Sequence, residues 1–317
     1  MSGTDEKKAG DAMTNRERAL AVLHYRPYDR MPVVHFGYWN ETAEKWAEEG
    51  HITREQAAGW GDGNVFDDEI SGKLGFDFNW GGGYGAAMGL FPGFEEKVVE
   101  EFPDGSQHIM DTAGVVTLRK PGAGSIPTHI SHTLTDRASW EEHYKWRLEF
   151  AEERITESTV TVGAERLKWN EGGLNHLRTA PGGDKLRKVS CGSLFGGIRN
   201  FLGLEGTCYM LVDDPELLEE IVDTVGGLAL RVLKMVFAAG ARFDVGHFWE
   251  DICFRSGPLV MPDFFARVVG PHYKRITDLL AGHGVDIVSL DCDGKIDALV
   301  PIWLENGVNT MFPIEVG

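Results

Sequence analysis

One short apolar run, VDIVSLDCDG at residues 285–294, constrains the fold of this chain more than any other stretch. Val285, Ile287, Val288 and Leu290 are too few for a helix, and most are β-branched, which is typical of a strand. Because apolar side chains occupy both alternating positions, the strand is predicted to be buried on both faces, as in a parallel sheet. Parallel neighbours need crossover connections, so helices are expected between the strands.

The rest of the chain supplies that alternation. Further strands are predicted at residues 31–37, 76–80, 188–193, 241–248 and 309–315. Helices are predicted between them. Thr14 and Glu17 match the capping box that begins the first helix, and Pro215 lies near the start of a long helix at residues 213–240. Strands that alternate with helices predict parallel strands with right-handed crossovers. We therefore expect an α/β fold, a TIM barrel cut short after about six of its eight β/α units.

Three further boundaries follow from local patterns. Residues 1–13 are polar and lack an apolar core, which predicts a disordered tail and no signal peptide, and residues 14–317 are expected to form a single barrel domain. Residues 94–120 alternate around Asp-Gly and Ala-Gly turns, which predicts an antiparallel hairpin or three-stranded excursion. Since a closed barrel leaves no open edges, we expect the reading frame to continue past Gly317 by two more β/α units.

Charge and cysteine usage exclude several classes of partner. The formal net charge of −18 disfavours nucleic acid, anionic membranes and heavily anionic substrates. No run approaches the length of a membrane-spanning helix. The four cysteines show no CxxC spacing, which indicates reduced thiols and a cytoplasmic location. Cys191 and Cys208 are expected to be small buried hydrophobes, Cys292 to point away from the cavity, and Cys253 to lie near the mouth, where it could join a metal.

Two carboxylates follow the strand in residues 285–291. If Val288 and Leu290 face a covering helix, Asp291 and Asp293 point together into the opposite cavity. Two like charges so close need a cation or a shared proton. The alternative is that Asp293 caps the next helix while Asp291 is solvated in a loop.

Other ionisable residues are predicted at neighbouring strand ends. His247, Glu250 and Asp251 lie within five residues, and so many ionisable groups at one strand end favour a catalytic role. For His247 there is an alternative: strict alternation with Phe243 would turn its side chain toward the helices as a core residue. Glu315 is predicted to point inward, with Phe312 and Ile314 outward; it could equally pair with Arg199 as structure.

Aromatic side chains gather at the same expected mouth. The candidates for substrate binding are His35, Tyr38, Trp39, Trp80, Tyr84 and Trp249. Their concentration beside loops favours a flat apolar ligand, although the same rings could simply cover the core.

Four segments resemble the uroporphyrinogen decarboxylase superfamily, which includes corrinoid-dependent methyltransferases. They are TNRERALAVLHYRPYDRMPV near the start, GSLFGGIRNFLGLEGTCYMLVDDPELLEEIVD, GHFWEDICFRSGPLVMPDFFARVVGPHYKRITDLL and DIVSLDCDGKIDALVPIWLENGVNTMFPIEVG. The resemblance spans about residues 14–317 and implies a TIM barrel. The arginine-rich stretch that holds carboxylates in the decarboxylases is replaced here by HFGYWNETAEKW.

The resemblance also implies chemistry. The methyltransferase branch binds zinc through an H-x-C-G pattern, and aligned on Gly294 it places Asp291 and Asp293 at ligand positions. It therefore implies a zinc ion held by Asp291, Asp293 and either Glu315 or His247, acting as a Lewis acid on an ether or alcohol oxygen. The reaction expected is methyl transfer between a small methylated substrate and a corrinoid protein. The alternatives are uroporphyrinogen III decarboxylation and a non-catalytic barrel fragment.

Overall fold

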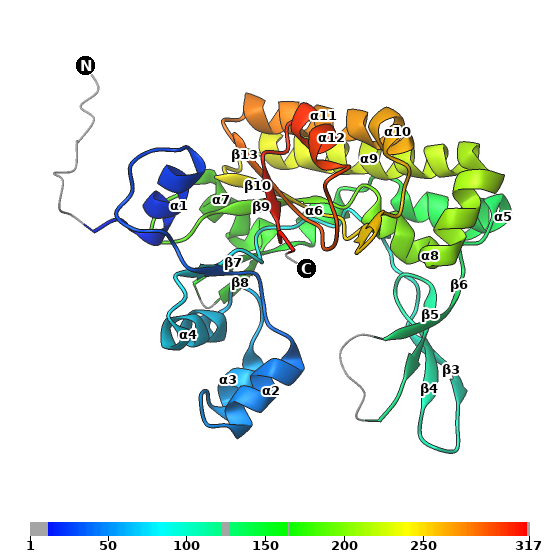
Figure 1. Ribbon diagram of the computed structural model, residues 1–317, viewed down its shortest axis with the longest axis horizontal. Helices are drawn as coiled ribbons and strands as arrows, with labels where there is room; N and C mark the ends of the chain where they lie inside the picture. The colour runs from blue at the N-terminus through cyan, green and yellow to red at the C-terminus, as the bar shows by residue number, and fades with distance from the viewer. Residues whose placement is uncertain (1–11, 122–126, 164, 316–317) are drawn as a thin grey trace. The chain divides into compact units, whose positions relative to one another are not determined.

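A computed structural model describes residues 12–121, 127–163 and 165–315 (Figure 1). The chain divides into two compact units. The first unit comprises residues Met1–Gly82 and Ala180–Arg187, and the second comprises Gly83–Thr179 and Lys188–Gly317. The single domain expected over residues 14–317 stays a prediction, and the two units are described separately.

The first unit holds four helices and a short parallel strand pair. Its elements are α1 (Asn15–Leu23), β1 (Val34–His35), α2 (Asn40–Glu48), α3 (Arg54–Gly59), α4 (Val65–Leu74) and β2 (Phe78–Asn79). The capping box predicted at the start of α1 is confirmed, since the Glu17 amide donates to Thr14 Oγ1 over 3.1 Å and the Thr14 amide donates to Glu17 Oε2 over 2.9 Å. In the strand pair, Val34 lies opposite Phe78 and His35 opposite Asn79.

The second unit contains a four-stranded parallel sheet in the order β14-β13-β10-β9. Its strands and main helices are β9 (Lys188–Gly192), α8 (Gly196–Asp213), α9 (Pro215–Ala238), β10 (Val245–Trp249), α10 (Pro262–Phe264), α11 (Gly270–Gly282), β13 (Ile287–Asp291), α12 (Val300–Glu305) and β14 (Thr310–Phe312). A π-helical turn at Phe265–Val269 joins α10 to α11. The short pair β11 (Cys253–Phe254) and β12 (Gly257–Pro258) is antiparallel.

Helices cover one face of the parallel sheet (Figure 1). Phe248 and Leu290 are fully buried on that face, and Gly246 lies so close to α11 that an added Cβ would be 2.5 Å from Leu280 Cδ1. The long helix predicted at residues 213–240 is confirmed as α9, whose start is stabilised by Asp214 Oδ1 accepting from the Leu217 amide over 3.0 Å. The prediction that β13 is buried on both faces is confirmed, since Ile287, Val288, Ser289 and Leu290 are all buried and only Asp291 is partly exposed.

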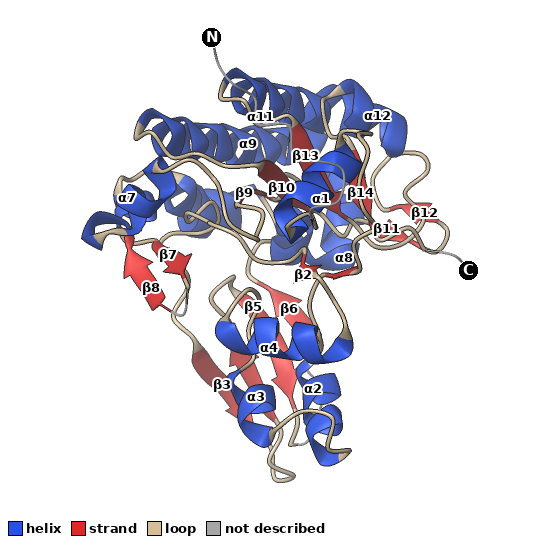
Figure 2. Cartoon of the chain, turned by 90° about the vertical axis from the view of Figure 1, so that its left-hand side faces the viewer, coloured by secondary structure: helices blue, strands red, loops and turns tan. Residues whose placement is uncertain are grey.

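The antiparallel excursion is larger than predicted. It is a four-stranded sheet in the order β3-β4-β5-β6, made of β3 (Lys97–Glu101), β4 (Gln107–Met110), β5 (Val115–Arg119) and β6 (Thr128–His132) (Figure 2). The prediction over residues 94–120 missed β6, because Thr128–His132 is polar and mostly exposed and carries no apolar alternation.

The remaining segment of the second unit also has regular structure. Its elements are α5 (Arg137–Ser139), the turns Trp140–Tyr144 and Lys145–Leu148, α6 (Glu153–Thr156), β7 (Thr159–Val162), β8 (Glu165–Lys168), the turn Trp169–Glu171 and α7 (Gly173–Arg178). The strands β7 and β8 form an antiparallel hairpin.

The fold class is mixed α/β with parallel and antiparallel sheets. All six predicted core strands are present, as β1, β2, β9, β10, β13 and β14, and each neighbour pairing among them is parallel. The described residues contain no closed barrel. The TIM barrel stays a prediction.

Candidate functional site

The face of the parallel sheet opposite the helices, here called the polar face, carries polar side chains near the carboxyl ends of the strands. His247 pairs in register with Ser289, Trp249 pairs with Asp291, and Asp291 pairs in turn with Phe312. Residues paired in register point to the same face, so β10, β13 and β14 build one row of polar and aromatic groups. The predicted orientation of Asp291 is consistent with this, because Val288 and Leu290 belong to the buried core.

His247 lies on this polar face rather than toward the helices. Its Nδ1 is 2.8 Å from Ser289 Oγ, and its ring stacks on Phe312 with centroids 5.7 Å apart and planes 11° apart. The orientation suggested by alternation with Phe243 is wrong because β10 begins only at Val245. Burial, with the nearby charge of Lys188, lowers the pKa of His247 to about 4, so the imidazole is neutral at pH 7.

Glu250 has a structural role in place of the catalytic role expected for it. Its side chain is fully buried, and the amides of Leu194, Phe195 and Gly196 donate to its carboxylate over 2.8, 2.9 and 2.6 Å. Ser193 Oγ donates over 3.1 Å, and the Tyr273 hydroxyl donates as well. Burial raises the pKa of Glu250, while these hydrogen bonds oppose that rise.

This carboxylate stabilises the beginning of α8. The amide groups at a helix N-terminus lack partners within the helix, and a negative charge there is favourable. The contact requires glycine at position 196, because a Cβ on Gly196 would be 1.7 Å from the Glu250 carbonyl oxygen. Glu250 therefore fixes the loop after β9 against the end of β10.

Asp251, the next residue, is exposed to the site. Its backbone has a φ of 48°, a left-handed conformation that is unusual for a residue other than glycine. Arg199 Nη2 donates to the Asp251 carbonyl oxygen over 2.9 Å and to its Oδ2 over 3.1 Å. The structure thus pairs Arg199 with Asp251, in place of the alternative pairing with Glu315.

Four acids interact at the carboxyl ends of these strands: Asp251, Asp291, Asp293 and Glu315, here called the strand-end acids. Burial, together with the charges of Asp293 and Asp251, raises the pKa of Asp291 to about 7. Burial and the charges of Asp251 and Glu315 also raise the pKa of Asp293. A carboxyl whose pKa is about 7 exists in comparable amounts as acid and as base at neutral pH.

Glu315 joins this group from outside the sheet. It follows β14 beyond Pro313, in an exposed segment. The predicted outward orientation of Phe312 is wrong, because Phe312 is the residue that stacks on His247, whereas Met311 packs against the core. A strand of three residues leaves too short a pattern to fix the alternation from sequence.

The strand-end acids do not form a ready zinc site. Across the described ranges, no three histidine, cysteine, aspartate or glutamate side chains are grouped so that they could hold one metal ion. Zinc needs about four ligands arranged as a tetrahedron. These residues as placed therefore do not fit the implied zinc ion, and no chemical step is assigned to it.

The cysteines divide between buried and exposed positions. Cys191 and Cys292 are fully buried in the core, as predicted, whereas Cys208 is exposed on α8, so its predicted burial is wrong. Cys253 is also buried, and the Ile252 amide beside it donates to Cys292 Sγ over 3.3 Å. The neighbouring Cys292 thiol, with burial, raises the pKa of Cys253, which disfavours the thiolate that a metal would need.

The predicted aromatic cluster is divided between the two units. In the first unit, His35 Nε2 is 2.8 Å from Ser71 Oγ and its ring stacks on Tyr38 with centroids 4.4 Å apart. Trp80 is buried there and Trp39 is exposed. Their common role in substrate binding stays a prediction.

In the second unit, Trp249 and Tyr84 differ sharply. Trp249 is 37% exposed at the end of β10, in register with Asp291, and could contact a ligand there. Tyr84 is buried, its hydroxyl lies 3.0 Å from Ser158 Oγ, and its ring packs against Phe243. Tyr84 is thus a core residue in place of the binding residue expected.

Three residues of the site were missed by the sequence analysis. Ser289 and Phe312 flank His247, and Tyr273 reaches Glu250 from α11. The alternation around Asp291 did signal the orientation of Ser289. The contacts of Phe312 and Tyr273 join segments distant in sequence, and no local pattern reports them.

Comparisons with known proteins add little to this geometry. No protein-family model matches the chain, and no curated protein sequence matches it. Among solved structures, a methyltransferase from Methanosarcina mazei is similar over 94% of this chain and 75% of that chain, with 14% sequence identity and a TM-score of 0.49. No helix among the described residues combines the length and the hydrophobicity needed to cross a membrane.

Proposed function

We propose that this chain is a methyl-transfer enzyme whose reacting groups are the strand-end acids, with Asp291 as the general acid. The observation that carries the proposal is the mutual proximity of these acids at the carboxyl ends of the strands, beside Trp249 and the His247–Phe312 stack. The reaction class comes from the resemblance to the uroporphyrinogen decarboxylase superfamily, whose methyltransferase branch moves methyl groups between small substrates and corrinoid proteins.

In the proposed reaction the bond between the methyl carbon and its oxygen or nitrogen breaks, and that heteroatom keeps the electron pair. The acid form of Asp291 donates its proton to the heteroatom, which makes it a better leaving group. A reduced corrinoid on a partner protein would supply the nucleophile that bonds to the methyl carbon. The ionised form of Asp291 must then regain a proton from solvent before the next turnover.

The charge of the site favours a neutral or cationic substrate. The strand-end acids would repel an anion, and Arg199, the arginine closest to them by its contacts, is already paired with Asp251. Trp249 and Phe312 offer aromatic faces, which suit a neutral aromatic substrate such as a methylated phenol, whose ether oxygen has a lone pair to accept the proton of Asp291. Uroporphyrinogen III carries many carboxylates, so its decarboxylation is disfavoured.

The test separates these reactions in parallel assays. The purified protein is incubated with reduced cobalamin and either a methylated phenol or a methylated amine, and formation of methylcobalamin is followed by absorbance. A second assay supplies uroporphyrinogen III and measures carbon dioxide. Methylcobalamin formed only with the methylated compounds supports the proposal; carbon dioxide release without methyl transfer would overturn it.

A variant pair ties the activity to the site. Asp291→Asn should lower the methyl-transfer rate at least about 100-fold, the scale of a lost general acid. Asp297→Asn changes an exposed acid nearby in sequence and should leave the rate unchanged. Metal analysis of the same preparations tests for the predicted zinc ion. If the protein holds stoichiometric zinc and Asp291→Asn loses it, Asp291 is a metal ligand and not a general acid.

A further inference from the structure

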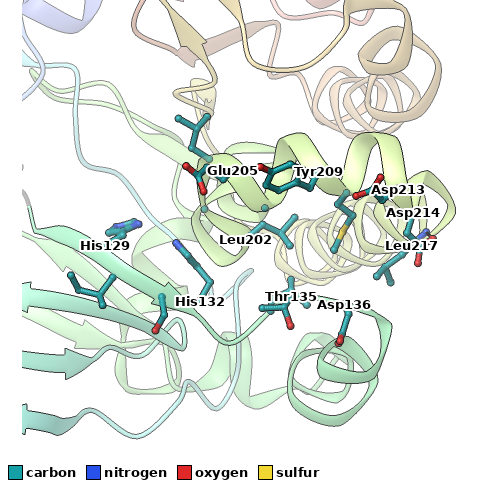
Figure 3. A pocket seen from close by; sticks show the side chains of 17 residues that line it. His129, His132, Thr135, Asp136, Leu202, Glu205, Tyr209, Asp213, Asp214 and Leu217 are labelled. Carbon is teal, nitrogen blue, oxygen red and sulfur yellow. Dashed lines mark hydrogen bonds between the residues drawn. The ribbon is translucent and has the colours of Figure 1, made fainter.

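A cavity of about 820 Å³ lies in the second unit, between β6 and α8 (Figure 3). Four successive residues of β6 line one side, and the part of α8 that follows Leu202 lines the other. Ligand pockets of a few hundred to about 1,000 Å³ hold a small molecule or a few residues of peptide. None of the lining residues belongs to the site proposed above.

The free edge of β6 opens into this cavity. The strand is the last in the order β3-β4-β5-β6, and among the described residues β5 is its only strand partner. His129, Ile130, Ser131 and His132 all line the cavity, and the pairing with β5 is irregular at Ile130, because Val116 pairs with Ser131 and Thr117 with His129. Such an edge presents backbone donors and acceptors that can pair with another strand.

Glycine at position 203 allows α8 to run close to this strand. Gly203 has a φ of 71°, which interrupts the helical backbone of α8, and a Cβ there would be 2.4 Å from His132 Nε2. His132 Nδ1 lies 3.1 Å from the Phe201 carbonyl oxygen. The end of β6 is thereby held against α8, and the cavity lies between the two elements.

The cavity wall combines apolar and acidic groups. Leu134, Leu202 and Met210 are buried beneath it, whereas Ile130 and Tyr209 are 46% and 66% exposed at its surface. Exposed apolar residues of this size, gathered at one cavity, are typical of a binding surface. Four acids also line it.

Two of these acids, Glu205 and Asp213, make no hydrogen bond or ion pair within the described part of the chain. By contrast, Asp136 and Asp214 in the same wall are engaged as helix caps. Unengaged carboxylates beside an apolar floor favour a ligand that carries both positive and apolar groups.

We propose that this cavity binds an extended peptide of alternating basic and apolar residues, which adds as a strand to the free edge of β6. Its backbone would pair with residues 129–132, its apolar side chains would contact the Leu202–Met210 floor, and its basic side chains would approach Glu205 and Asp213. Strand addition supplies affinity through main-chain hydrogen bonds and specificity through alternate side chains.

The test uses a synthetic seven-residue peptide that alternates lysine and valine, blocked at both ends and labelled for fluorescence anisotropy. Two further versions carry N-methyl groups on either the odd or the even residues. A strand added at an edge uses alternate peptide groups, so one methylated version should lose binding and the other should keep it. Hydrogen exchange should slow at residues 128–132 when the unmodified peptide binds.

Charge variants complete the test. Glu205→Gln and Asp213→Asn should each weaken binding about threefold or more, as expected for the loss of one charge pair. Glu216→Gln, an exposed acid on α9 outside the cavity, should leave binding unchanged. The proposal is overturned if the peptide does not bind at about 1 mM, if both methylated versions bind equally, or if residues 128–132 gain no protection.

Discussion

Asp291, at the end of β13, lies close to the carboxylates of Asp251 and Asp293, and their repulsion makes the free energy of unfolding depend on pH. Its pKa of about 7 in the folded chain lies above the ordinary value of about 4. Between these values the folded state holds a proton that the unfolded state has lost. Raising the pH through this window therefore lowers the free energy of unfolding.

The prediction is that Asp291→Asn stabilises the protein at pH 8. Because the side chain is partly exposed, solvent screening reduces the gain to about 1–2 kcal/mol, and the gain should disappear near pH 4. Urea unfolding at both pH values measures it. Asp297→Asn serves as the control and should show no such pH dependence; equal effects of the two variants would contradict the assignment of a raised pKa to Asp291.

The same residue sets the pH dependence of activity. As a general acid, Asp291 must be protonated, so the rate of methyl transfer should fall as the pH rises through about 7. The measurement is the rate with reduced cobalamin and a methylated substrate between pH 5 and 9. A rate that increases steadily across pH 7 would instead indicate that the ionised form of Asp291 acts, as a base or as a metal ligand.

The carboxylate of Glu250 stabilises the folded state by accepting hydrogen bonds from backbone amides. Glu250→Gln replaces a buried acceptor by an amide whose NH₂ group would face the amides of Phe195 and Gly196. Leaving buried donors unpaired should lower the free energy of unfolding by about 2–4 kcal/mol. Chemical denaturation measures this loss. Glu216→Gln, at an exposed position of α9, is the control, and a similar small effect of both changes would show that Glu250 does not hold the loop.

At the scale of elements, the junction between β9 and α8 depends on the close approach of the Gly196 backbone to the Glu250 backbone. Gly196→Ala would place a methyl group against the Glu250 carbonyl, so we expect a loss of at least about 2 kcal/mol. Gly227→Ala, on an exposed face of α9 with open space around it, should instead stabilise by about 0.5–1 kcal/mol. Thermal unfolding compares the pair, and the same sign for both would argue against the steric account.

Element positions were more predictable than side-chain directions. The six core strands and α9 follow from apolar runs, Pro215 and Asp214, which are local signals. The directions in β10 and β14 were not predictable, because Phe243 lies before β10 and packs as core, and Thr310–Phe312 is too short to show a period. These directions depend on register with β13, which is a contact between distant segments.

In the candidate site, too, features set within one strand were predictable and features set by distant contacts were not. The orientation of Asp291 followed from its alternation with Val288 and Leu290 inside one strand. The role of Glu250 did not, because its partners lie in the loop before α8 and on Tyr273 of α11. A carboxylate at a strand end appears identical in sequence whether it meets substrate or backbone amides.

For the whole molecule, the net charge of −18 predicts a response to salt. Mutual repulsion among the excess acids favours expansion of the chain, and added ions screen it. Raising sodium chloride from about 10 to 500 mM should increase the melting temperature by about 2–5 °C. Differential scanning calorimetry measures this shift, and a melting temperature that falls with salt would show that attractive ion pairs outweigh the repulsion.

The close approach of Gly196 to Glu250 also limits how this chain can evolve. A side chain added at position 196 would have to displace the backbone at Glu250, and with it the neighbouring Asp251. Descendants of this sequence are therefore expected to inherit Gly196 and Glu250 as a pair. A mutant library aimed at new substrates would retain more folded members if it held both positions constant and varied Trp249 and Phe312 instead.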